Sequence, residues 1–166
     1  MFRASKQQKD VEWMSKTKKG SVLMQYEYLE ERIMMSKCGD LKAFEGLILE
    51  GCGSLYLYAA MIKNTKNERI RLVRNTYMTA WNRLQMLEIP GRFDLWIKGI
   101  LWKQAAIECH EEEEVIQKIA EDGVSNLIRE AFKSSENYWY LPLDDKYSLA
   151  ETVISDIQSG ASRMIS

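Results

Sequence analysis

The residues best suited to catalysis or metal binding gather at one point of the chain. His110, the single histidine, follows Cys109 and precedes the acidic run at 111–114. Consecutive residues of a helix point about 100° apart, so these metal-ligating side chains do not converge easily on one ion. With one histidine, no further Cys–His or Ser–His–Asp arrangement can be built. We therefore expect no enzyme, no metal site and no cofactor.

The cysteines and the hydropathy of the chain indicate a soluble protein in a reducing environment. Cys38, Cys52 and Cys109 are too few and too scattered for a disulfide framework or a structural zinc site. No apolar run approaches the roughly 20 residues of a transmembrane helix. The segment 1–20 also lacks the apolar core of a signal peptide. We expect a cytoplasmic protein that makes no contact with a membrane.

Composition indicates a globular chain whose charge is unevenly distributed. Of the 166 residues, 46% are apolar and 28% are charged, which excludes a highly charged disordered chain. The net charge of −1 excludes a uniformly basic nucleic-acid binder. Residues 1–107 nevertheless carry 18 Lys or Arg against 11 Asp or Glu, whereas residues 108–166 carry five against thirteen. The first part can attract phosphate, and the acidic part can repel it or cover the same face.

Apolar residues recur at helical spacing along most of the chain, which predicts an all-α fold. The only prolines are Pro90 and Pro142, and Asp40 is placed to cap a helix. The expected helices cover 26–37, 41–63, 68 to just before Pro90, 93–106, 111–132 and 147–158. We expect a compact bundle of about four helices over 26–110, preceded by a basic arm at 1–25 and followed by an acidic helical segment at 111–166.

Large aromatic residues follow the same helical spacing. Trp81, Phe93 and Trp96 fall on the apolar sides of their helices, and we expect them in the core. Trp102 comes six residues after Trp96, which turns it to another face, where we expect it to be exposed.

The order of segments between 26 and 107 resembles a known family. A short acidic helix, YEYLEERIMMSKCGD, precedes LKAFEGLILEGCGSLYLYAAMIKN, then NERIRLVRNTYMTAWNRLQML, and finally RFDLWIKGILWKQAAIE. The AFE and LY.YA elements, the Leu72-Val73 pair before Trp81, and Phe93, Trp96 and Ile100 follow in this order. This arrangement resembles region 2 of bacterial sigma factors, most closely the extracytoplasmic-function type.

The resemblance implies two partners, core RNA polymerase and promoter DNA. Polymerase docking would fall on the helix that includes Arg71, Leu72, Val73, Arg74, Asn75 and Tyr77. Capture of the melted −10 element would fall on the following loop and helix, through Arg83, Glu88, Ile89, Pro90, Gly91, Arg92, Lys98 and Lys103. A loop over aromatic and basic side chains can hold an unstacked base, and its cations can contact phosphates.

Three functions remain open. In the first, the chain is a split or diverged sigma factor, because no helix-turn-helix pattern follows residue 110, and a second protein supplies −35 recognition. In the second, it is a regulator that keeps the fold without reading a promoter, and its acidic segment covers the basic face as an anti-sigma-like or self-inhibiting device. A separate anti-sigma protein is a further partner that the resemblance allows. In the third, it is a helical interaction module unrelated to transcription. Arg71 and Arg74 bear on this choice, since the family has an acidic residue and a glutamine at those positions.

Overall fold

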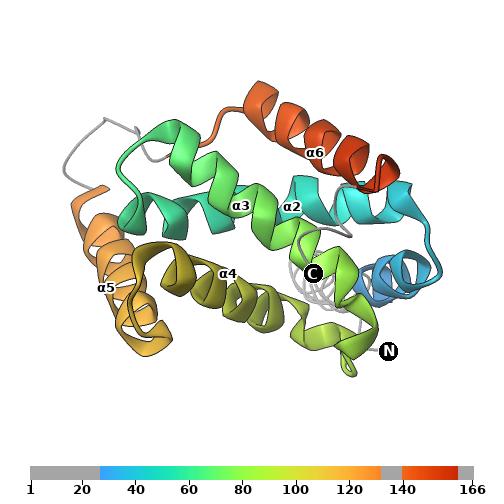
Figure 1. The fold of residues 1–166 in the computed structure, drawn as a ribbon, viewed down its shortest axis with the longest axis horizontal. Coiled ribbons are helices and arrows are strands. Elements are labelled where there is room, and N and C mark those ends of the chain that lie inside the picture. The colour runs from blue at the N-terminus through green and yellow to red at the C-terminus, as the bar shows by residue number, and fades with distance from the viewer. Residues whose placement is uncertain (1–26, 132–139, 161–166) are drawn as a thin grey trace, which may run out of the picture.

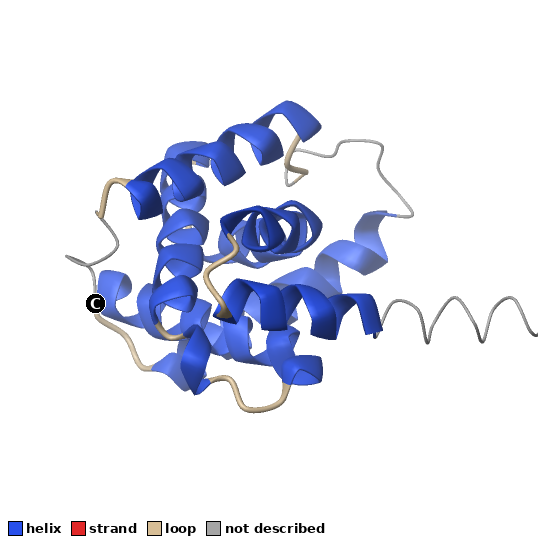
Figure 2. Ribbon diagram, turned by 90° about the vertical axis from the view of Figure 1, so that its right-hand side faces the viewer, coloured by secondary structure: helices blue, strands red, loops and turns tan. Residues whose placement is uncertain are grey.

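The computed structural model describes residues 27–131 and 140–160, so the basic arm expected at 1–25 lies outside the described residues. Within these ranges every regular element is a helix and none is a strand (Figure 2). The all-α prediction is therefore confirmed. None of these helices is both long and apolar enough to span a bilayer.

Six α-helices form the described part of the chain, and their order matches the predicted one (Figure 1). The first covers residues 27–37. The others are α2 (Leu41–Ile62), α3 (Lys66–Asn82), α4 (Phe93–Cys109), α5 (Glu113–Ala131) and α6 (Leu143–Gln158). Two short 3₁₀ turns, η1 (Leu84–Met86) and η2 (Pro90–Arg92), join α3 to α4. The third helix thus ends earlier than expected, and the last begins four residues before the predicted start, directly after Pro142.

Side chains cap the first turns of α2 and α3. Asp40 Oδ1 accepts hydrogen bonds from the backbone N–H groups of Lys42 at 3.0 Å and Ala43 at 3.2 Å. Thr65 Oγ1 accepts one from the backbone N–H of Glu68 at 3.2 Å. These bonds satisfy donors that have no partner within the helix, which explains why both helices begin where they do. The cap predicted at Asp40 is confirmed.

Helix α2 is the centre of the bundle and contacts α3, α4, α5 and α6 (Figure 1). Its apolar residues are therefore needed on several sides, and eight of them are buried. Phe44 packs against α3, with its ring centroid 5.0 Å from that of Trp81 and 6.3 Å from that of Tyr77. Phe93 is buried, and Trp81 and Trp96 pack half-buried against the core, as predicted.

Trp102 is buried, and the prediction that it is exposed is wrong. It is only 6% exposed, and its ring meets that of Tyr58 from α2 edge-on at 5.5 Å between centroids. The six-residue step does turn Trp102 away from Trp96. Both sides of α4 are covered, however, because α4 packs against α2, α3 and α5 together.

Helices α5 and α6 contribute to the same core as the preceding helices. Ile116 and Ala120 from α5 and Leu149 and Val153 from α6 are each at most 3% exposed within it. The core therefore continues across residue 110, where the sequence analysis placed a boundary. Gly123 has a packing role here, since a Cβ at this position would lie 2.8 Å from Met61 Sδ.

Candidate nucleic-acid interface

The loop that the resemblance assigns to promoter capture is compact. Backbone N–H groups of Leu87 and Arg92 donate to the carbonyls of Leu84 at 3.1 Å and Ile89 at 3.0 Å, closing the turns η1 and η2. Pro90 starts η2, where its fixed φ suits a helical turn and its missing N–H costs nothing. Leu84 and Leu87 are buried and attach the loop to the core.

An open hollow of about 390 Å³ lies between this loop and the first turn of α4. The side chains of three apolar residues at the hollow are largely exposed: Met86 at 72%, Ile89 at 53% and Leu95 at 72%. The half-buried Trp96 lines the same hollow, with its ring 6.0 Å from that of Phe93. Leu87, Glu88 and Arg92 complete the lining. Apolar walls beside one cation and one anion suit a flat, partly polar group such as a nucleobase.

The predicted DNA-binding residues divide into those at the hollow and those away from it. Glu88, Ile89 and Arg92 line the hollow, and Pro90 and Gly91 form the turn between them. Arg83, the C-terminal cap residue of α3, is exposed.

The two lysine candidates of α4 point in different directions. Lys103 is exposed and lies two helical turns after Trp96, on the same face of α4. Lys98 lies elsewhere, because its ammonium sits over the Tyr58 ring at 4.9 Å from the centroid. Lys103 therefore lies on the face of α4 that lines the hollow, whereas the Lys98 side chain is directed toward α2.

Two hydrogen bonds join the loop to the end of the helix at 27–37. The Lys37 ammonium donates to the carbonyl of Leu87, and Gln85 Nε2 donates to the carbonyl of Lys37 at 2.7 Å. Sequence reasoning missed both residues. Their partners are 50 and 48 residues away along the chain, and no local pattern marks such a pair.

Three of the six predicted polymerase-docking residues belong to the core. Leu72 and Val73 are fully buried and Tyr77 is 1% exposed. Their side chains cannot reach a partner surface while α3 is folded, because α2, α4 and α6 pack around that helix. The same helical spacing that carries the resemblance is the spacing of a buried face.

The remaining docking candidates, Arg71, Arg74 and Asn75, reach the surface to different degrees. Arg71 is exposed, whereas Arg74 and Asn75 are half-buried, and the buried Arg74 Nε has no hydrogen-bond partner among the described residues. Arg71 borders a hollow of about 310 Å³ with Lys63, Glu68 and Glu108. Within it, Lys63 Nζ lies 3.1 Å from Glu108 Oε2.

Two buried titratable groups, Cys52 on α2 and Tyr77 on α3, lie close together. Burial raises the pKa of Tyr77 well above 10.0, and nearby Cys52 and Asp94 act in the same direction. Burial also raises the pKa of the Cys52 thiol above 9.0, against a smaller opposing effect of Lys146. Cys52 is thus held as an unreactive thiol. The Tyr77 hydroxyl would lie 2.8 Å from a Cβ at Gly51, so a glycine is needed at this approach.

The residues around the single histidine lie at the C-terminal end of α4. His110 is an exposed cap residue in the left-handed conformation, with φ 53°. In the described ranges 27–131 and 140–160, no group of three or more His, Cys, Asp or Glu residues is arranged to hold a metal ion.

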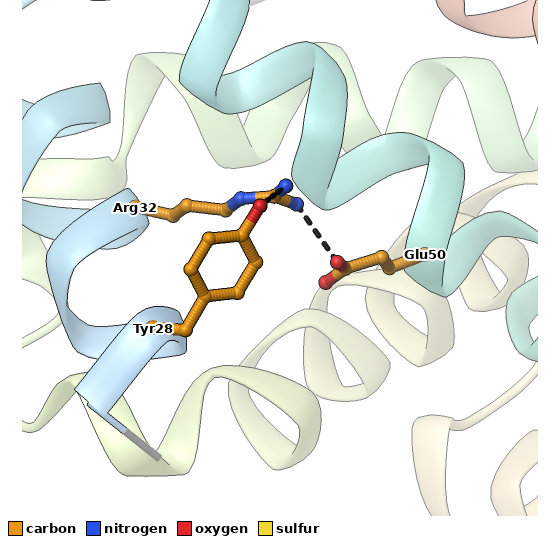
Figure 3. A network of polar contacts seen from close by, with 3 residues as sticks. All are labelled: Tyr28, Arg32 and Glu50. Carbon is orange, nitrogen blue, oxygen red and sulfur yellow. Dashed lines mark hydrogen bonds and ion pairs between the residues drawn. The ribbon is translucent and has the colours of Figure 1, made fainter. Parts of the chain in front are cut away.

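A polar network fastens the helix at 27–37 to α2 (Figure 3). The Arg32 guanidinium lies over the Tyr28 ring, 4.0 Å from the centroid, and donates to the Tyr28 hydroxyl. It also forms an ion pair with Glu50, with Arg32 Nη1 2.8 Å from Glu50 Oε1. A Cβ at Gly46 would lie 2.6 Å from the same nitrogen, so Gly46 leaves room for the guanidinium. The network joins this helix to α2, and the Lys37 contact joins it to the loop.

Comparisons of the chain with protein-family models, with curated proteins and with solved structures find no match.

Proposed function

We propose that this chain is a sigma-factor-like transcription protein that binds core RNA polymerase and contributes to capture of the promoter −10 element. One observation carries the proposal. The loop to which the resemblance assigns base capture is the loop that lines the open hollow with Trp96 and Arg92.

The chemistry of the hollow suits a base from a melted strand. Stacking on an aromatic ring contributes about 1–3 kcal/mol per base and tolerates every base, since each has a π-face. Arg92 at the hollow and the exposed Arg83 and Lys103 are available for phosphates of the same strand. Such phosphate contacts position the strand without reading its sequence.

Polymerase docking then falls on the part of α3 that solvent reaches. Arg71 is exposed and Arg74 and Asn75 are half-buried, so this strip presents cations. The complementary polymerase surface should therefore be acidic, because like charges facing each other across an interface are costly.

Fluorescence anisotropy with a labelled single-stranded oligonucleotide and the matching duplex tests the base-capture part. We expect the single strand to bind more tightly than the duplex. Arg92→Ala should weaken binding of the single strand and reduce the slope of log affinity against log salt by the amount expected for one phosphate contact. Arg129→Ala is the matched control, because Arg129 is also an exposed arginine but lies on α5. Equal binding of strand and duplex, or equal effects of the two variants, would contradict base capture.

Pull-down of core RNA polymerase tests the docking part. Arg71→Glu should abolish capture while Arg129→Glu leaves it intact. Alanine at Leu72 or Val73 is unsuitable, since truncating a buried aliphatic side chain costs about 2–5 kcal/mol of stability. A chain that captures neither polymerase nor DNA would instead be a helical interaction module.

A second candidate function is a regulator whose acidic C-terminal segment covers the basic face. The observation in its favour is the ion pair between Lys66 Nζ on α3 and Asp145 Oδ2 on α6, at 3.0 Å. In that case Asp145→Asn should raise the affinity for single-stranded DNA. Asp122→Asn on α5 is the control, because it removes one distant negative charge, and its effect on the affinity should be smaller. Deleting the whole segment would not test this, because α5 and α6 supply part of the core.

A further inference from the structure

Lys37 occupies an unusual position for a lysine beside a candidate DNA-binding loop. It is the last residue of the helix at 27–37 and is half-buried. Its ammonium donates to the carbonyl of Leu87, next to the hollow. By charge alone Lys37 would count among the phosphate contacts, but its geometry indicates another role.

The contact with the loop runs in both directions. Lys37 donates from its side chain to Leu87, and its own backbone carbonyl accepts from Gln85 Nε2 at 2.7 Å. A carbonyl at the last turn of a helix has no partner within the helix, so the Gln85 amide satisfies a group that would otherwise need water. A cation at this end also interacts favourably with the helix dipole. Both bonds therefore favour one placement of the loop on the helix end.

The two bonds attach the first part of the loop that lines the hollow. Met86, Leu87 and Glu88 line the hollow, and the bonded residues Gln85 and Leu87 lie on either side of Met86. The buried side chains of Leu84 and Leu87 hold the base of the loop in the core. Among the residues that the structure describes, the Lys37 and Gln85 hydrogen bonds are the polar contacts that join this stretch to the helix at 27–37.

We infer that Lys37 is a positioning residue, which holds residues 84–92 in the shape that forms the hollow and does not itself contact the ligand. Its effect on ligand capture rests on the proposed function, whereas its hold on the loop does not.

Hydrogen exchange measured by mass spectrometry tests the hold on the loop. Lys37→Met keeps the aliphatic stem and removes the ammonium, and we expect exchange of the 84–92 amides to become about tenfold faster. Lys37→Arg keeps donors at the end of the chain and should return the rate toward that of the parent. Lys42→Met is the matched control, because Lys42 is an exposed lysine whose side chain bonds to no described residue.

Binding of the single-stranded oligonucleotide at several salt concentrations tests the positioning role. A positioning residue predicts that Lys37→Met lowers the affinity severalfold at each salt concentration, with an unchanged slope of log affinity against log salt. A phosphate contact would instead reduce that slope by about 0.7, and this result would overturn the inference. Unchanged exchange in Lys37→Met would overturn it as well. If the parent binds no single strand, the proposed function fails, while the exchange measurement still decides whether Lys37 holds the loop.

Discussion

Gly51 is the position at which one added methyl group tests how closely α2 approaches α3. A Cβ there would lie 2.8 Å from the Tyr77 hydroxyl oxygen, closer than such atoms normally approach. Tyr77 is 1% exposed, so its ring has little room to withdraw. We therefore expect Gly51→Ala to destabilise the fold, although alanine is the better helix former.

The size of the effect follows from two opposing terms. Replacing glycine by alanine inside a helix contributes about 1 kcal/mol of stability. Forcing a methyl group into a packed interior costs about 1–3 kcal/mol. The net expectation for Gly51→Ala is a loss of about 1 kcal/mol, which corresponds to a fall of about 2–4 °C in Tm for a chain of this size. Urea unfolding followed by circular dichroism measures the free energy, and a thermal scan measures Tm.

Two further variants make the test specific to the Tyr77 hydroxyl. Gly99→Ala on α4 is the matched control, because a Cβ there meets nothing within 4 Å, and it should stabilise by about 0.5–1 kcal/mol. In a Tyr77→Phe background, Gly51→Ala should become neutral or stabilising, since the obstructing oxygen is gone. A Gly51→Ala effect equal to that of Gly99→Ala in the parent, or a cost unchanged by removal of the hydroxyl, would refute close packing of Tyr77 on Gly51.

Two other predictions concern stability. His110→Gly should stabilise by about 1 kcal/mol in urea unfolding, because His110 caps α4 with φ 53°, a conformation that glycine adopts without strain; no gain over His110→Ala would contradict this. Alkaline pH should destabilise the fold, since burial raises the pKa of Cys52 above 9.0 and of Tyr77 above 10.0, so the folded state holds both protons more tightly than the unfolded chain. Their contribution is fully present below pH 9.0 and falls as pH rises past these values, by up to about 1.4 kcal/mol per pH unit for each group. Tyr77→Phe should flatten the decline above pH 10.0, and a decline identical to that of the parent would show that Tyr77 is not its source.

The candidate site illustrates where sequence reasoning succeeds and where it fails. Local periodicity and the proline at position 90 predicted a loop before α4 and a buried Phe93 at the start of that helix, and the structure has both. Spacing could not decide whether Leu72 and Val73 contact a partner or belong to the core. An apolar pair on a helix is consistent with either, and only the neighbours packed on α3 decide.

Several properties of this protein are determined by the sequence itself. The all-α class, the order of the helices and the cap at Asp40 depend on hydrogen bonds and side-chain patterns within a few residues, so they can be read locally. Tertiary structure alone decided that Trp102 is buried, that α5 and α6 join the core, and that Lys37 meets Leu87. Each of these depends on which helix faces come together across tens of residues, and the free energy of that packing is shared among many contacts that no short stretch of sequence contains.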